Sequence, residues 1–260
     1  MSGWIYQQKP SMGWPLQPDS KIIPDVGFWP MLAGTGDTVQ DLSRNGFNGI
    51  KNAGVAWVGA STGSALDFEA DSMGQVLTTF DNDSGSKFTF IFKYTPESTV
   101  AQAMGWRSAN RFYWFYNGSG LHQFFFNASI AINFSHTLTA GVTYTIAITY
   151  NRGQGCLYVD GVLVDDVVSG TQTWFIDGAF AIGNRNGSNL PMDGIIEYVY
   201  LYRRALSASE IALLYRYPFY MFKDPNEVAV LGAGVVAAGT NPKGPLGHPL
   251  HGALAGPISF

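Results

Sequence analysis

The stretch MDGIIEYVYLYRRALSASEIALLY, residues 192–215, predicts a turn, a buried strand and a short helix in succession. The Asp193-Gly194 dipeptide is typical of turns. Every residue from 195 to 202 except Glu197 is apolar or aromatic, and this pattern indicates a strand that is covered on both faces. Such a strand needs another layer of structure on each side, so the rest of the chain must supply two layers.

A short helix is predicted directly after this strand. Ser207 and Glu210 have the spacing of a capping box, in which the serine hydroxyl accepts a hydrogen bond from the third helical N–H and the glutamate reaches back to the serine N–H. Ile211, Leu214 and Tyr215 follow at helical spacing. We therefore expect an apolar helix face that packs against the domain.

The composition favours many short strands joined by glycine turns. Charged residues make up only 13% of the 260 residues and aromatic residues 15%, while 31 residues are glycine. The net charge of −4 and the absence of a basic cluster argue against a nucleic-acid partner. The only cysteine, Cys156, rules out an intrachain disulfide framework and a cysteine-based zinc site.

No membrane association is expected from the sequence. No apolar run approaches the ~18 residues that a membrane-spanning helix needs. Residues 1–30 contain prolines throughout and no apolar run, unlike a classical signal peptide. The expectation is a protein that is made in a cytosol and is not exported by the classical secretory route.

Several other segments have the alternation that is typical of strands. In residues 88–94 and 143–150 apolar side chains occupy every second position, so each segment is predicted to turn one apolar face inward. Turn residues at 117–120 and at Asp160-Gly161 predict two hairpins. Strands joined in this way predict two antiparallel sheets packed face to face. The expected inward residues are Phe88, Phe90, Phe92 and Tyr94, then Tyr144, Ile146, Ile148 and Tyr150; further strands are expected at residues 65–68, 75–78, 111–116, 122–126, 131–134, 156–165 and 179–183.

Two terminal segments differ from this pattern. Residues 1–25 form a proline-rich arm with Trp4, Tyr6 and Trp14 but few aliphatic residues, so the arm is not expected to fold by itself. Its aromatic side chains are expected to lie either on the chain's own sandwich or on a neighbouring protein. Residues 223–260 form an apolar tail rich in Gly, Ala and Pro, which we expect to pack on a partner or on a second copy.

Residues 192–215 also resemble the closing segment of the laminin-G-like jelly rolls, which belong to the concanavalin A-like lectin/glucanase superfamily. That segment typically reads G-x-I-D-E-V-x-I-Y-x-R-A-L-S-x-x-E-I, and this chain departs from it at Ile196, where the family usually has Asp. Residues 157–164 (LYVDGVLV) and 179–183 (AFAIG) resemble a hairpin and the following strand of the same family. The segment 217–222 resembles the Pro/aromatic ending of phage-encoded, stand-alone members.

This resemblance covers residues 28–215 and implies an all-β fold. We expect a two-sheet antiparallel jelly-roll sandwich at residues 26–222, with one short C-terminal helix. Extended N- and C-terminal arms are expected at residues 1–25 and 223–260.

A turn-rich segment near the start of the domain is also similar to the family. Residues 34–49 resemble the opening G-x-G-x-x-x-x-D-x-S-G-x-x-x-x-G, with Asp41 and Asn45 at turn positions. One interpretation is a calcium site that uses Asp41, Asn45 and Glu197, because calcium binds hard oxygen ligands. The alternative is an Asx-type turn at Asp41 and a structural role for Glu197 as an acceptor for backbone N–H groups or an arginine. The expectation is therefore no cofactor or one structural calcium ion.

The superfamily includes glycoside hydrolases, which need two carboxylates beside one glycosidic bond. Their usual strand signature, E-x-D-x-x-E, is absent from this chain. Glu210 is assigned to the helix cap, and Glu97 and Glu227 lie beside prolines in loop sequence. Glu197 alone is expected on a strand among apolar neighbours, where an unpaired carboxylate would be costly. We therefore expect a protein without enzymatic activity.

Aromatic side chains are candidates for binding a glycan, because the faces of sugars stack on tryptophan and tyrosine rings. The alternative is that most of these rings belong to the core of the sandwich. The candidate residues are Trp106, Tyr113, Trp114 and Trp174, together with Tyr116.

The leading functional hypothesis is a structural interaction protein of a virion, such as a capsid decoration or tail protein. Two non-polar arms, residues 1–25 and 223–260, favour assembly with further copies of this chain or with other virion proteins. The alternative is a carbohydrate-binding, lectin-like adhesion module, which is compatible with the first hypothesis if a virion protein also binds host glycans. The expected location is the virion, or alternatively the cytoplasm or release without a classical signal peptide.

Overall fold

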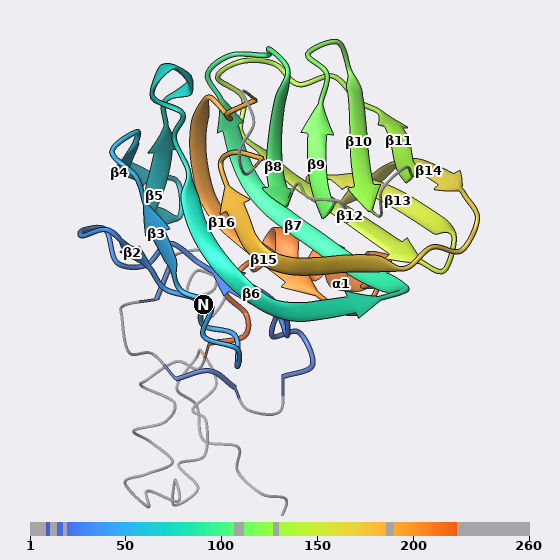
Figure 1. Cartoon of the computed structure of the whole chain (residues 1–260). Helices are drawn as coiled ribbons and strands as arrows, with labels where there is room; N and C mark the ends of the chain where they lie inside the picture. Colours follow the sequence, from blue (N-terminus) through green and yellow to red (C-terminus); the bar gives the residue numbers. More distant parts are fainter. Residues whose placement is uncertain are drawn as a thin grey trace, which may run out of the picture. The chain divides into compact units, whose positions relative to one another are not determined.

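The computed structural model describes residues 9–10, 15–17, 20–106, 112–126, 130–185 and 190–222. In this part of the chain two antiparallel sheets of eight strands each pack face to face (Figure 1). The predicted two-sheet sandwich with one short helix near its C-terminal end is confirmed.

The first sheet contains the strand that organises the fold. Its members are β1 (Gly27–Trp29), β4 (Val55–Ala60), β5 (Gly63–Phe68), β7 (Lys87–Pro96), β12 (Tyr144–Asn151), β13 (Gln154–Val159), β14 (Val162–Val168) and β16 (Gly194–Tyr202). The strand order is β14-β13-β12-β7-β16-β5-β4, and β1 also pairs with β16. The predicted strand is therefore β16, which lies inside the sheet and is buried on both faces.

The second sheet covers the inner face of the first. Its members are β2 (Thr38–Val39), β3 (Gly49–Lys51), β6 (Val76–Gly85), β8 (Gln102–Trp106), β9 (Phe112–Tyr116), β10 (Leu121–Phe126), β11 (Ile130–Ser135) and β15 (Trp174–Ile182), in the order β11-β10-β9-β8-β15-β6-β3-β2. A short 3-10 helix, Ala70–Ser72, lies between β5 and β6. Both predicted hairpins are confirmed, as β9–β10 and β13–β14. Asp160 and Gly161 both have positive φ in the second hairpin, as a tight Asp-Gly turn requires.

An apolar core fills the space between the two sheets. Aromatic rings contact one another across it; the ring centroids of Phe88 and Phe124, for example, lie 4.6 Å apart. Alternation along the strands therefore predicted the inward faces of β7 and β12 correctly. The core includes all eight residues expected to point inward, Phe88, Phe90, Phe92, Tyr94, Tyr144, Ile146, Ile148 and Tyr150.

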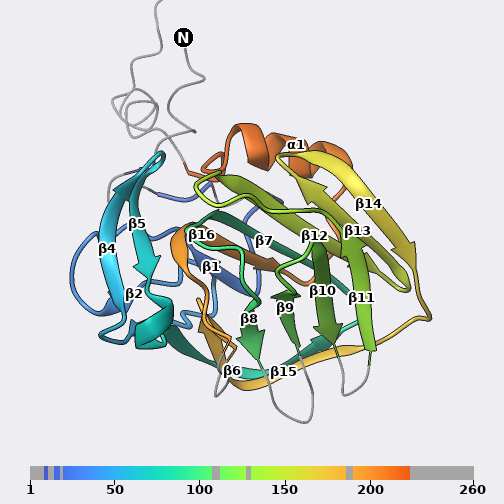
Figure 2. The same ribbon diagram turned by 90° about the horizontal axis from the view of Figure 1, so that it is seen from above.

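A second apolar layer lies on the outer face of the first sheet, where α1 (Ala208–Arg216) packs (Figure 2). The predicted capping box is present, because Glu210 N donates to Ser207 Oγ at 3.3 Å and Ser207 N donates to Glu210 Oε2 at 2.8 Å. Ile211 and Leu214 are buried in this layer. Tyr215, which was expected on the same face, is instead 46% exposed, because its ring lies at the edge of a cleft.

The described part of the N-terminal arm lies on the chain's own sandwich. Lys9 N donates to Thr62 O at 2.7 Å, and Gln17 N donates to Met221 O at 2.8 Å. Ile22 is buried in the outer layer. These residues of the arm therefore lie on the chain's own sandwich, which was one of the two expected locations, the other being a neighbouring protein.

Other expectations fall on residues outside the described ranges. These are Trp4, Tyr6 and Trp14 of the arm and the whole tail, residues 223–260. Among the described residues no helix combines the length and the apolar character that a membrane span requires.

Candidate functional site

A cleft opens on the outer face of the first sheet, beside α1. Its larger part has a volume of about 630 Å³ and its smaller part about 270 Å³. The two parts adjoin, because several residues line both. The shared residues are Ser61, Lys93, Tyr215 and Pro218; the larger part adds Thr62, Ala212 and Arg216, and the smaller part adds Thr143, Thr145, Asp160 and Tyr198.

A β-bulge in β16 places Glu197 beneath the floor of this cleft. Ile196 lies opposite Tyr94 of β7, and Tyr198 lies opposite Lys93, so Glu197 is the extra residue in the strand. Ile196 therefore faces the core between the sheets, whereas Tyr198 faces the outer layer. The bulge lets a charged residue occupy an otherwise apolar strand without entering the core.

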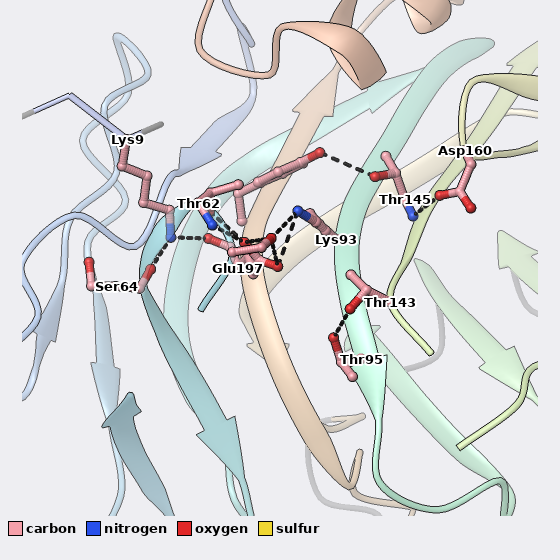
Figure 3. Close-up of polar contacts among 11 residues, drawn as sticks. Lys9, Thr62, Ser64, Lys93, Thr95, Thr143, Thr145, Asp160 and Glu197 are labelled. Atoms are coloured by element: carbon pink, nitrogen blue, oxygen red, sulfur yellow. Dashed lines mark hydrogen bonds and ion pairs between the residues drawn. The ribbon is translucent and has the colours of Figure 1, made fainter. Parts of the chain in front are cut away.

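Glu197 is only 1% exposed, yet both of its carboxylate oxygens have donors (Figure 3). Ser61 Oγ lies 2.8 Å from Oε1, and Thr62 N and Oγ1 donate to Oε2 at 2.9 and 2.5 Å. Lys93 Nζ lies 3.2 Å from Oε1. Burial by itself would raise the pKa of Glu197, but the Thr62 hydrogen bonds and the Lys93 charge outweigh it and lower that pKa. The carboxylate is therefore ionised at neutral pH.

Two lysines approach Glu197 from different sides. Lys93 Nζ also donates to Ser61 Oγ at 2.5 Å and faces the cleft. Lys9, from the arm, donates to the backbone carbonyls of Ser64 and Glu197. Burial lowers the pKa of Lys9 to about 7, although the charge of Glu197 opposes this shift. The arm is thus held to the sheet directly behind the cleft floor.

The hydroxyl groups of Thr143 and Thr145 continue the polar floor (Figure 3). Thr95 Oγ1 and Thr143 Oγ1 are 2.7 Å apart, and Thr145 Oγ1 lies 3.5 Å from Tyr198 OH. Asp160, at the β13–β14 turn, accepts a hydrogen bond from Thr145 N at 2.8 Å through Oδ1. The floor therefore offers both hydrogen-bond donors and acceptors to a polar ligand.

The wall of the cleft is formed by α1 and the residues that follow it. Tyr215 packs against the β13–β14 turn at Gly161, where a Cβ atom would come within 3.0 Å of the tyrosine side chain. The glycine therefore allows the turn to approach the helix closely. Arg216 is exposed at the end of α1, and Pro218 accepts a hydrogen bond from Tyr200 OH at 3.1 Å.

The structure does not bring the proposed calcium ligands together. Asp41 Oδ1 accepts from Phe28 N at 2.7 Å and Ser43 N at 2.8 Å, and it shares no hydrogen-bond partner with Glu197. Asn45 Nδ2 donates to backbone carbonyls. Among the described residues no group of three or more His, Cys, Asp or Glu side chains could hold a metal ion. The Asx turn at Asp41 is present, and calcium binding at these residues stays a prediction.

The aromatic candidates for glycan stacking need correction. Trp114, Tyr116 and Trp174 are fully buried in the core between the sheets. Tyr113 is also buried, with its ring stacked on Phe125 at a centroid distance of 4.6 Å. Core packing thus covers the ring faces that a sugar would need. The side chain of Trp106 lies outside what the structure describes.

Several residues of the cleft were not identified from the sequence. Lys93 had a detectable signal, since it is the only charged residue in the alternating segment 88–94 and takes an outward position. Ser61 and Thr62 lie in a polar turn whose sequence resembles that of many other turns. Their role depends on the pairing of β4 with β5 and of β5 with β16, which the local sequence does not reveal.

The chain is similar in sequence to one protein superfamily. A family model described as the concanavalin A-like lectin/glucanases superfamily matches residues 70–212. No curated protein matches the chain in sequence.

Similar solved structures include two toxin binding domains and a sialidase. The binding domain of Paraclostridial Mosquitocidal Protein 1 has a TM-score of 0.61 at 16% identity, over 74% of this chain and 52% of that chain. The binding domain of Botulinum neurotoxin DC, in complex with rat synaptotagmin II, has a TM-score of 0.59 at 14% identity, over 77% and 53%. Trypanosoma rangeli sialidase in complex with the inhibitor DANA has a TM-score of 0.55 at 19% identity, over 82% and 36%.

These structures share a fold with this chain, and the chain spans about half of their length or less. The family model covers more than half of the chain and includes β16, the strand from which the prediction started. The chain belongs to the concanavalin A-like lectin/glucanase superfamily.

Proposed function

We propose that the protein is a non-enzymatic binding module that holds a saccharide in the cleft beside α1. The observation that carries this proposal is an exposed Tyr215 ring on the wall of a cleft whose floor is rich in hydroxyl groups. Sugars pack their C–H faces on aromatic rings, while their hydroxyls exchange hydrogen bonds with groups that both donate and accept. The larger part of the cleft also has the volume of a typical small-ligand site.

A binding role fits the state of Glu197 better than a catalytic one. Both oxygens of this carboxylate already accept hydrogen bonds, and the side chain lies beneath the cleft floor. Glycoside hydrolysis needs two carboxylates that flank the bond to be cleaved. Asp160 is the only carboxylate among the residues that line the described cleft. The fold shared with toxin binding domains supports the same conclusion.

The experiment is a binding screen of the full chain against immobilised glycans, followed by calorimetry with the best ligand. We expect Tyr215→Ala to weaken binding about tenfold, because loss of aromatic stacking costs on the order of 1 kcal/mol. Tyr220→Ala is the matched control, since Tyr220 is 38% exposed but is not among the residues that line the cleft. Equal affinity of the two variants for the glycan, or no glycan bound by the parent protein, would contradict the proposal.

A second candidate function is assembly into a virion as a capsid decoration or tail protein. It is favoured by the edge strand β14, whose Val162, Leu163, Val164 and Val168 are all exposed. Apolar side chains on an edge strand often contact another protein. The other proposed contacts are residues 223–260 and the arm, residues 1–25, although the described residues of the arm also contact the chain's own sandwich. Under this hypothesis the protein is located in the virion and forms homo-oligomers or binds other virion proteins.

Light scattering after size exclusion tests this second function on the full chain. Val168 is 78% exposed, so Val168→Lys should leave the fold intact while it disrupts an apolar contact. We expect the parent chain to form a defined oligomer and the variant to dissociate. A parent chain that stays monomeric at high concentration and in the presence of purified virions would contradict the assembly function.

A further inference from the structure

We propose that the saccharide held in the cleft is an acidic one, with its carboxylate in the larger part of the cleft between Lys93 and Arg216. This inference rests on the proposed saccharide-binding function and adds the chemical class of the ligand. It comes from the distribution of charge along the cleft, which is uneven.

The larger part of the cleft is cationic. Lys93 and Arg216 line it, and none of the other residues that line it carries a charge. Glu197 does not line this part, and its charge is already matched by Lys93 beneath the floor. A negatively charged group that entered here would meet the guanidinium of Arg216 and the ammonium of Lys93, which also pairs with Glu197 beneath the floor.

Lys93 has a hydrogen-bond donor left for such a group. Its ammonium carries three N–H groups. One is directed at Glu197 Oε1 at 3.2 Å and one donates to Ser61 Oγ at 2.5 Å. The third can donate to a ligand, because the side chain faces both parts of the cleft.

Arg216 is the second cation and comes from the last turn of α1. Its guanidinium lies 5.9 Å from the centroid of the Tyr217 ring. Among the described residues no carboxylate is within ion-pair distance of it. A guanidinium binds a carboxylate through two parallel hydrogen bonds, and such charge-assisted bonds are stronger than those to a neutral hydroxyl.

The smaller part of the cleft has the opposite character. Asp160 lines it and uses Oδ1 to accept a hydrogen bond from Thr145 N. Its second oxygen can accept hydrogen bonds from sugar hydroxyls. Thr143, Thr145 and Tyr198 add hydroxyl groups to the same part. The cleft therefore fits a ligand with a carboxylate at one end and hydroxyl groups at the other.

The test compares acidic saccharides with their own methyl esters, which remove the charge and keep the ring. The probes are galacturonate oligosaccharides, hyaluronan fragments and sialyllactose, each as the free acid and as the methyl ester, with the full chain in calorimetry. We expect at least one free acid to bind about tenfold more tightly than its ester, a difference that falls as the salt concentration rises.

Variants then assign this difference to the cleft. Arg216→Gln should abolish most of the preference for the acid and leave binding of the ester unchanged, while Arg216→Lys should retain part of the preference. Arg44→Gln is the matched control, because Arg44 is exposed and lines a different hollow. An unchanged preference in Arg216→Gln would overturn the proposed position of the carboxylate.

The outcomes separate the two proposals. If acid and ester bind equally well, and Tyr215→Ala weakens both, the saccharide function stands and the acidic class is wrong. If no acid, ester or neutral glycan binds, both proposals are wrong.

Discussion

Glu197 and His122 are both buried titratable side chains, but their surroundings have opposite effects on their charge. Glu197 lies on β16 of the first sheet, and His122 lies on β10 of the second sheet, where it is 0% exposed. Glu197 has donors on both oxygens and a lysine beside it, and its pKa is lowered, so the charged form persists. Burial lowers the pKa of His122 to about 3, so the neutral form persists.

The difference arises from the hydrogen-bond partners. His122 Nδ1 accepts a hydrogen bond from Trp114 Nε1 at 3.2 Å, a contact that only the neutral ring can make at that nitrogen. His122 Nε2 is buried without a hydrogen-bond partner among the described residues. The ring centroid of His136 lies 5.9 Å from that of His122, and repulsion between two positive imidazole rings also lowers the pKa of His122. Burial therefore removes a charge unless the structure also supplies partners for it.

The largest expected effect comes from removing the carboxylate of the partnered cluster. We expect Glu197→Ala to lower the free energy of unfolding by about 4 kcal/mol, because Lys93 and the donors of Ser61 and Thr62 lose their acceptor. Glu197→Gln keeps one acceptor oxygen and should cost about half as much. Urea denaturation measures both. A loss below about 1 kcal/mol in Glu197→Ala would show that the partners rearrange, and the comparison with His122 would then fail.

The next effect is the pH dependence of stability, in which His122 and Glu197 are expected to act in different pH ranges. The folded-state pKa of His122 lies below its ordinary value of 6.5, so the unfolded chain binds the proton first as the pH falls. The His122 contribution to stability should be complete only above about pH 7.5 and should fall by about 2 kcal/mol between pH 6.5 and 4.5. Glu197 loses its contribution in a different pH range. Its pKa is lowered in the folded state, so the ionised carboxylate stabilises the fold above pH 4.5, and this stabilisation is lost only as the pH falls further.

Urea denaturation at several pH values measures this separation. The pH dependence between 6.5 and 4.5 should largely disappear in His122→Gln, whose amide oxygen can still accept from Trp114 Nε1. His136→Gln is the companion variant, because the pKa of His136 is also lowered by burial. The same slope in parent and His122→Gln would show that His122 is protonated without penalty.

A smaller effect is expected for Glu210, a carboxylate that has an arginine partner but is not deeply buried. Glu210 is half-buried, and the Arg204 hydrogen bond lowers its pKa to about 2 even though burial opposes the shift. Arg204 Nη2 lies 2.8 Å from Glu210 Oε1. We expect Arg204→Gln to raise the pKa of Glu210 towards 4.5 in an NMR titration, with a stability change below about 1 kcal/mol. A pKa that stays near 2 would assign the shift to the Ser207 cap instead.

The smallest expected effect concerns calcium and Asp41, a third buried carboxylate. Its oxygens accept from three backbone N–H groups and from Ser43 Oγ, so its acceptor sites are already used. We expect the melting temperature to be the same with calcium and with a chelator. A rise with calcium that is lost in Asp41→Asn would instead establish the structural calcium ion that the sequence suggested.

Much of the fold could be predicted because its signals are local. The capping box at Ser207 and the Asp160-Gly161 turn depend on residues a few positions apart, and the structure contains both. Alternation predicted the inward faces of β7 and β12 for the same reason. The exposed position of Tyr215 was missed. Helical spacing identifies the apolar face of a helix, but it does not show which residues of that face the neighbouring strands and turns bury.

The sequence by itself determined the two hairpins, the helix start, the superfamily and most of the longer strands, since each is encoded in short patterns of side chains. It did not predict β4 or β8. Only the tertiary structure decided the cleft. The bulge at Glu197 depends on the register of β16 against β7, and the Ser61–Glu197 hydrogen bond joins residues 136 positions apart. A carboxylate in an apolar strand is stable only when distant donors meet it, and strand pairing across the whole sheet, not local propensity, brings those donors into place.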